Sequence, residues 1–203
     1  MAAIIGGVRF RKIDPAFYPF IYCIWIAFAN ELISFYLTKT KHSTAINNNI
    51  YVLLESVLIS WQFKKWGYLQ KPSYLSAIII SCLAALWVID AFFVYSIKQT
   101  ISYYRIIYSC FIIVVSVTVI NKELAFAMGA VTKSPVFILC VAFTIYFTFK
   151  IVTGLFWLYG LGSNMKFLLS LVAIINVVNC ITNLIYALAV LWMPTKQRFS
   201  LPY

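Results

Sequence analysis

Carboxylates interrupt three long apolar stretches of this chain, and a carboxylate in such surroundings can bind a cation or exchange a proton. They are Glu31 in FANELISFYL, Glu55 in NNNIYVLLESVLISW and Asp90 in LWVIDAFFVY. Placing one charged side chain at the centre of a bilayer costs about 3 kcal/mol even on a lenient insertion scale. If these stretches cross a membrane, the acids must face a bundle interior, pair with a basic group or contact water.

Later stretches supply partners for these acids. Arg105 lies near the start of one apolar run, and Lys150 lies inside the next. Asn176, Asn179 and Asn183 recur at i, i+3 and i+7, so on a helix they form one polar stripe. Such amides bind polar solutes, but they also join helices by hydrogen bonds within membranes. Both interpretations of the stripe stay open.

Composition places these residues in a membrane protein. Of 203 residues, 64% are hydrophobic and 10% are charged, whereas a soluble domain is about half apolar and about one quarter charged. The formal net charge of +11 would suggest nucleic-acid binding in a soluble protein. Here the basic residues lie mostly in short segments between apolar runs, as expected when they determine topology. We therefore expect a lipid bilayer as the surroundings and no nucleic acid as a partner.

Six apolar runs approach or exceed the roughly 20 residues that a helix needs to cross the hydrocarbon core. Because they are continuously apolar rather than alternating, helices are expected and not a barrel. The fold class is thus an all-α integral membrane protein, with one polytopic domain over 1–203 and a single bundle of six transmembrane helices. The expected spans are 15–37, 49–64, 74–97, 102–121, 135–159 and 166–192.

Basic residues predict the orientation of this bundle. With the N-terminus inside, the cytoplasmic segments hold ten basic residues: Arg9, Arg11, Lys12, Lys64, Lys65, Lys71, Lys122, Lys133, Lys196 and Arg198. The outer segments hold five: Lys39, Lys41, Lys98, Arg105 and Lys166. Both termini are therefore expected in the cytoplasm. The short loops and the lack of an N-x-S/T sequon are typical of a multi-pass protein of a bacterial inner (plasma) membrane.

Helix geometry places the acids at a common depth. At about 1.5 Å per residue, Glu31, Glu55 and Asp90 each lie roughly 10 Å below the outer ends of their spans. We expect Glu31 and Glu55 to face each other across the first hairpin, with Arg105 or Lys150 in salt-bridge range of an acid. The predicted ligand-binding set in the outer half comprises Glu31, Glu55, Asp90, Arg105, Lys150, Asn176 and Asn179.

Binding or translocation of a small polar solute or ion is the function that this site favours, with a partly desolvated carboxylate binding and releasing the ion. The alternative is a non-catalytic sensor or assembly subunit whose buried charges fix helix packing, working with a second copy or another membrane protein. A third possibility is an enzyme acting on lipid, but no nucleophile or metal constellation accompanies the acids. The five cysteines lack CxxC spacing and the chain has one histidine, so no metal or other cofactor is expected.

Overall fold

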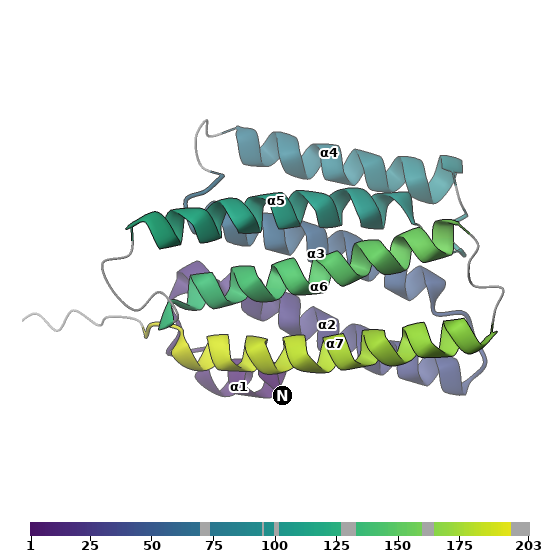
Figure 1. Ribbon diagram of the computed structural model, residues 1–203, viewed down its shortest axis with the longest axis horizontal. Helices are drawn as coiled ribbons and strands as arrows, with labels where there is room; N and C mark the ends of the chain where they lie inside the picture. The colour runs from purple at the N-terminus through teal and green to yellow at the C-terminus, as the bar shows by residue number, and fades with distance from the viewer. Residues whose placement is uncertain (70–73, 95, 100–101, 127–132, 160–164, 196–203) are drawn as a thin grey trace, which may run out of the picture.

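The computed structural model describes residues 1–69, 74–94, 96–99, 102–126, 133–159 and 165–195 (Figure 1). Its elements are helical, as predicted: α1 (Ala2–Arg9), the 3-10 turn η1 (Pro15–Phe17), α2 (Tyr18–Lys39), α3 (Ala45–Lys65), α4 (Leu75–Ile89), the π-helical turn η2 (Asp90–Val94), α5 (Tyr103–Phe126), α6 (Pro135–Leu158) and α7 (Met165–Trp192). Three basic residues used for the orientation, Lys71, Lys196 and Arg198, lie outside the described residues, as does the side chain of Lys166.

Five of these helical segments are long and apolar enough to cross a membrane, which makes the chain a polytopic membrane protein. They are Pro15–Lys39, Leu75–Val94, Tyr103–Ala125, Pro135–Phe156 and Ala173–Trp192. The remaining long helix, α3, has 21 residues and is therefore about 31 Å long. It is too polar to qualify by composition, so a sixth span stays a prediction.

The polar residues of α3 explain its composition, because they point into the bundle. Asn49, Glu55, Ser56, Ser60 and Gln62 are all buried. In Figure 1, α3 lies behind α5 and α6, and α4 lies at one edge of the bundle. Helix α3 packs against α2, α4 and α5, while α6 packs between α5 and α7. A helix surrounded in this way can carry polar groups at membrane depth, since they do not meet lipid.

The N-terminal helix α1 was not anticipated by the sequence pattern. It spans only 8 residues and packs against α2 and α7. In Figure 1 its N-terminus lies part way along the bundle, and the helix runs from there to one end. Such a short helix gains its stability from tertiary contacts, which here include the Trp25 indole N–H bound to the carbonyl of Ala3 at 3.1 Å.

Arg9 fastens the end of α1 to the end of α7. Its guanidinium donates to the carbonyl oxygens of Val190 at 2.6 Å and Met193 at 3.4 Å, and also to that of Leu191. These carbonyls belong to the last turn of α7 or lie just beyond it, where a helix leaves acceptors without intrahelical donors. A positive charge there also complements the helix dipole.

Aromatic rings join α6 to α2 and α3. Phe143 on α6 packs edge-to-face with Phe20 on α2 at 5.9 Å and with Phe63 on α3 at 6.1 Å. Helices α5 and α6 approach closely at Gly154, where a Cβ atom would lie 2.9 Å from a side-chain carbon of Ile106. Close approach at a small residue is usual between membrane helices. These contacts fix the relative positions of α2, α3, α5 and α6.

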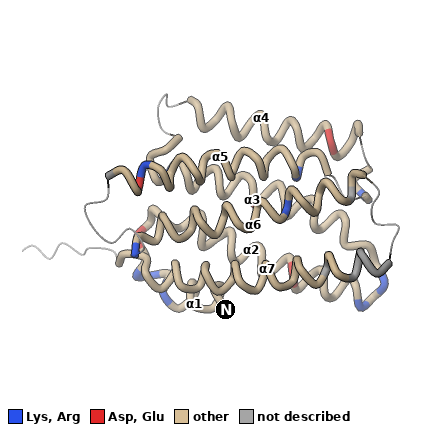
Figure 2. The backbone as a smooth tube through the Cα atoms, in the orientation of Figure 1, with Lys and Arg blue, Asp and Glu red and all other residues tan. Residues whose placement is uncertain are grey.

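Basic residues lie at both ends of the bundle but are more numerous at one of them (Figure 2). We call it the basic end; its described members are Arg9, Arg11, Lys12, Lys64, Lys65, Lys122 and Lys133. The loops at the opposite end carry Lys39, Lys41 and Lys98. This asymmetry is the one on which the predicted orientation depends.

Candidate functional site

A buried ion pair joins α3 and α6 in the middle of the bundle. The Lys150 Nζ atom lies 2.5 Å from Glu55 Oε2, and the side chains are 18% and 3% exposed. The expectation that Lys150 or Arg105 would pair with an acid is thereby confirmed for Lys150. A buried pair of this kind is stable only if further hydrogen bonds satisfy its remaining atoms.

Tyrosines supply those hydrogen bonds. The Tyr51 hydroxyl donates to Glu55 Oε1 at 2.8 Å, and the Tyr108 hydroxyl donates to Glu55 Oε2 at 2.5 Å. Lys150 Nζ also donates to the Tyr108 hydroxyl oxygen at 2.7 Å. Tyr51 and Glu55 are four residues apart on α3, so they share one helix face. Both oxygens of the Glu55 carboxylate are therefore satisfied within the protein.

Aromatic rings enclose the Lys150 ammonium group. Its Nζ atom lies 4.8 Å from the ring centre of Tyr146, 5.2 Å from that of Phe147 and 5.5 Å from that of Tyr108. The ring of Tyr51 follows at 5.7 Å. Ring faces attract cations at these distances, and the attraction grows when water is excluded. A carboxylate, a phenol oxygen and aromatic faces thus surround the Lys150 side-chain nitrogen together.

Two cavities adjoin the ion pair. The larger, of about 530 Å³, reaches from Phe20 and Tyr186 to Glu31 and Glu55. The smaller, of about 320 Å³, is lined by residues nearer the ends of α2 and α6 that lie opposite the basic end, and it includes Arg105, Lys150 and Asn48. Four residues line both cavities, one from each of α2, α3, α6 and α7: Glu31, Tyr51, Tyr146 and Asn179. The cavities therefore lie end to end between the same four helices, and they meet at these residues.

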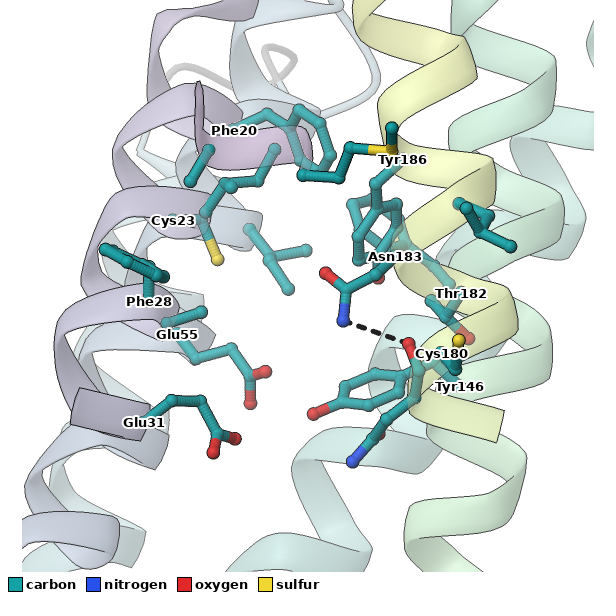
Figure 3. Close-up of a pocket in the computed structure, with 18 of the residues that line it drawn as sticks. Phe20, Cys23, Phe28, Glu31, Glu55, Tyr146, Cys180, Thr182, Asn183 and Tyr186 are labelled. Carbon is teal, nitrogen blue, oxygen red and sulfur yellow. Dashed lines mark hydrogen bonds between the residues drawn. The ribbon is translucent and has the colours of Figure 1, made fainter. Parts of the chain in front are cut away.

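Glu31 is the acid that remains open to the cavities. Its carboxylate accepts no hydrogen bond and forms no ion pair among the residues that the structure describes. Figure 3 shows Glu31 and Glu55 projecting from the same wall into the larger cavity, with Tyr146 and Asn183 on the opposite wall. The two acids thus meet at one cavity, as expected for the first hairpin, but their surroundings differ. Glu55 is neutralised by Lys150, and Glu31 is not.

The amide stripe of α7 lines the larger cavity. Asn176, Asn179 and Asn183 are all at its wall. Asn183 donates from its side chain to the carbonyl oxygen of Asn179 at 2.9 Å, shown dashed in Figure 3. That bond leaves the side-chain amide oxygen of Asn183 free to accept from another donor, because only its nitrogen is used.

Arg105 lies in the smaller cavity and not against an acid. Its guanidinium donates to Asn49 Oδ1 at 3.4 Å, and its Nε atom is buried without a hydrogen-bond acceptor in the described part of the chain. Asn49 in turn donates to the carbonyl oxygens of Ile97 and Gln99 at 3.0 and 2.7 Å. Arg105 is therefore tied to the segment that precedes α5.

Asp90 lines neither cavity, so the shared site expected for all three acids does not include it. Its Oδ2 atom accepts from the backbone N–H of Tyr104 at 2.7 Å, in the first turn of α5. The π-helical turn Asp90–Val94 sets the direction of this side chain, and depth alone could not reveal that. Carboxylates commonly satisfy the free N–H groups at helix N-termini and the dipole there. Asp90 thus anchors α5.

Tyr108 is the member of the ion-pair cluster that sequence reasoning missed. It reaches Glu55 from α5, a helix whose Arg105 alone had been considered. A signal did exist, because tyrosines precede charged residues by four positions at both Tyr51–Glu55 and Tyr146–Lys150. Those pairs indicate that phenols solvate the buried charges. The chain has 14 tyrosines, however, and their spacing does not reveal which one comes from a third helix.

Comparisons with known proteins assign no family. No family model matches the chain, and neither a curated protein nor a solved structure matches it. The geometry of the two cavities and their charged residues is therefore the basis for a functional assignment.

Proposed function

We propose that this membrane protein binds and translocates a small polar solute or ion between α2, α3, α6 and α7. The observation that carries the proposal is the end-to-end arrangement of the two cavities, which meet at Glu31, Tyr51, Tyr146 and Asn179. In bundles, ligand sites commonly form between helices near the middle of the membrane. Polar residues from four helices at one level are what such a pathway needs.

Glu31 is the group that exchanges the ion in this proposal. Sequence reasoning had placed that role on any of the acids, including Glu55. The Glu55 carboxylate, however, already accepts from Lys150, Tyr108 and Tyr51. Glu31 has no counter-ion among the described residues, and an uncompensated carboxylate at membrane depth is unfavourable, so Glu31 is the acid available to a bound cation. The Glu55–Lys150 pair then stays intact beside Glu31 while Glu31 binds and releases the ion.

Orientation and membrane belong to the same proposal. The basic end faces the cytoplasm of a bacterial cell, α3 forms a sixth span, and the smaller cavity opens toward the outer side. The clustering of Arg and Lys at one end supports this orientation. Translocation then runs from the smaller cavity past Glu31 into the larger one, or in reverse.

Reconstitution tests the proposal. Purified protein in liposomes is placed on a solid-supported membrane, and transient currents are recorded after jumps in proton, Na⁺, K⁺, amino-acid or alkylamine concentration. We expect currents above those of protein-free liposomes for at least one of these solutes, and their loss in Glu31→Gln. Glu123→Gln is the matched control, because Glu123 bonds to Tyr68 and Ser134 away from both cavities. Parent currents equal to the protein-free background for every solute would contradict translocation.

The Glu55 carboxylate has hydrogen-bond partners at both of its oxygens, and this favours a second candidate function, a non-catalytic sensor or assembly subunit. Both Glu55 carboxylate oxygens and two of the three Lys150 N–H donors are hydrogen-bonded within the chain, as expected of a structural pair. Such a subunit would purify with a fixed membrane partner or as a dimer, and it would show no current with any of these solutes. Copurification from mild detergent, followed by mass spectrometry, distinguishes the two.

A further inference from the structure

The larger cavity has a size and a lining that suit an organic ligand better than a bare ion. Its volume of about 530 Å³ lies within the roughly 300–1,000 Å³ that is usual for small-molecule sites. Its apolar wall includes Phe20, Ile24, Phe28, Phe143 and Leu184. An inorganic ion would occupy only the polar edge of this space. A ligand with an apolar body would fill the rest and remove apolar surface from water.

The charge of the larger cavity favours a cation. Glu55 is compensated by Lys150, whereas the Glu31 carboxylate has no ion pair with any described group, the amino group of Met1 included. The basic side chains of Arg105 and Lys150 line the smaller cavity and not the larger one. The basic group in the described lining of the larger cavity is the amino group of Met1, which forms no ion pair with Glu31. An anion at the junction would therefore meet the Glu31 carboxylate without a basic side chain of the larger cavity beside it.

The surroundings of Lys150 show how this bundle stabilises an ammonium group. The lysine uses a carboxylate, a phenol oxygen and ring faces. The same types of group stand at the junction, where Tyr51 and Tyr146 line both cavities beside the free carboxylate of Glu31. Asn179 adds an amide there. A second ammonium can thus be held next to the first in the same chemical manner.

From these observations we infer that the larger cavity takes a primary amine with an aliphatic or aromatic body. Its ammonium group binds Glu31 between Tyr51 and Tyr146, and its apolar part extends along Phe28 and Phe143 toward Phe20. The inference rests on the proposed function, because it names the solute class of that same site. The lining also predicts how the amine is oriented. Its ammonium group lies at the junction of the two cavities, and its apolar body points toward the basic end.

The inference is tested with three probes that share a phenyl body and differ mainly in charge. The protein in detergent is titrated with 2-phenylethylamine, its neutral analogue 2-phenylethanol and the anion 3-phenylpropanoate, and thermal unfolding and isothermal calorimetry are recorded. We expect saturable stabilisation by the amine and none by the alcohol or the carboxylate. In Glu31→Gln the amine should bind roughly tenfold or more weakly. Glu31→Asp, which keeps the charge, should retain most of the affinity, and Glu123→Gln should equal the parent.

Each outcome separates this inference from the function on which it depends. If Na⁺ or K⁺ binds in a manner that requires Glu31 while the amine does not bind, the amine assignment is wrong and ion translocation stands. Amine binding that is unchanged in Glu31→Gln, or that is shared by the alcohol, overturns the assignment too. Absence of binding by every cation, together with absence of current in liposomes, overturns both.

A thiol in the cavity provides a second measurement that does not depend on overall stability. Cys180 lines the larger cavity and is exposed. In a variant that retains it as the single cysteine, cationic 2-aminoethyl methanethiosulfonate should modify it faster than anionic 2-sulfonatoethyl methanethiosulfonate. Glu31→Gln should reduce that ratio severalfold, and 2-phenylethylamine should slow both reactions. A ratio that is insensitive to Glu31 would contradict an ammonium site at this carboxylate.

Discussion

Glu55 of α3 and Lys150 of α6 form an ion pair of 2.5 Å inside the bundle, between residues 95 positions apart in the chain. Because the pair is enclosed by Tyr51, Tyr108 and Tyr146, each charge depends on the other for its stability. The free carboxylate of Glu31 stands at the same cavity without such a partner. The protein therefore needs the charge of Glu55 for its stability but not that of Glu31. Neutralising each acid in turn should show this difference.

Glu55→Gln should destabilise the protein strongly. The change leaves the Lys150 ammonium without its counter-ion at membrane depth, and removal of one member of a buried pair typically costs about 3–5 kcal/mol. Thermal unfolding in detergent measures the loss. Glu31→Gln is the matched control, since it makes the same chemical change at an acid without an ion pair, and its stability should equal or exceed that of the parent. Equal losses in both variants would contradict the distinction between the two acids.

The double variant Glu55→Gln/Lys150→Met should recover much of that loss. Replacing both charges leaves neither unpaired, and well-packed neutral residues often substitute for a buried pair without a large cost. If the double variant is less stable than Glu55→Gln alone, the pair does not account for the instability. If it is stable and still active in the reconstituted assay, the pair is a packing device only.

Tyr108→Phe should test the phenol that completes the cluster. The substitution removes a donor to Glu55 and an acceptor for Lys150 while keeping the ring. Hydrogen bonds to charged groups contribute about 1.5–3 kcal/mol, so a loss of this order in the free energy of unfolding is expected. Tyr36→Phe, at an exposed position on α2, provides the control. Equal stability of the two variants would show that the Tyr108 hydroxyl does not support the ion pair.

Position along each helix was predictable from the sequence, and direction around each helix was not. Apolar length fixed the ends of α6 and α7 within one residue of the expected spans, because a helix rises uniformly along its axis. That regularity placed Glu31 and Glu55 at one level. Which face a residue presents depends on packing with neighbouring helices. Asp90 belongs to a π-helical turn, and its carboxylate accepts from the start of α5 instead of lining a cavity.

The helix α1 illustrates a second limit of sequence patterns. Its residues Ala2–Val8 are apolar but too few for a span-length run, and Arg9 alone gives no polar stripe. It forms because Arg9 meets the end of α7 and Trp25 binds Ala3, and both contacts join residues distant in the chain. Tyr108 was missed for the same reason, since its partner Glu55 lies two helices away.

Asp90→Asn should affect stability and leave ligand binding unchanged. The amide oxygen of asparagine can still accept from Tyr104, so the cost should be small, whereas Asp90→Ala removes the acceptor and should cost about 0.5–2 kcal/mol. Unfolding measurements compare the two variants, and amine binding by calorimetry should equal that of the parent in both. Weaker binding in Asp90→Asn at unchanged stability would return Asp90 to the binding site.

The orientation is open to a direct test in cells. Single cysteines replace His42, at the end of the bundle opposite the basic end, or Lys65, at the basic end, in a background without native cysteines. A membrane-impermeant maleimide should label residue 42 in intact cells and residue 65 only after the cells are opened. The reverse pattern would place the basic end outside and reverse the direction assigned to the two cavities.

Arg9→Gln should open the larger cavity toward the basic end. The guanidinium holds α1 to the last carbonyls of α7, and Met1 and Ala3 at the far end of α1 line the larger cavity. Loss of these bonds should let α1 separate locally while the long helices stay packed. The modification rate of Cys23, which is 8% exposed and lines the same cavity, should then rise severalfold toward a water-soluble thiol reagent. Arg11→Gln is the control, because Arg11 is exposed and makes no hydrogen bond within the described residues. A Cys23 rate that is equal in both variants would mean that α1 does not close this end of the cavity.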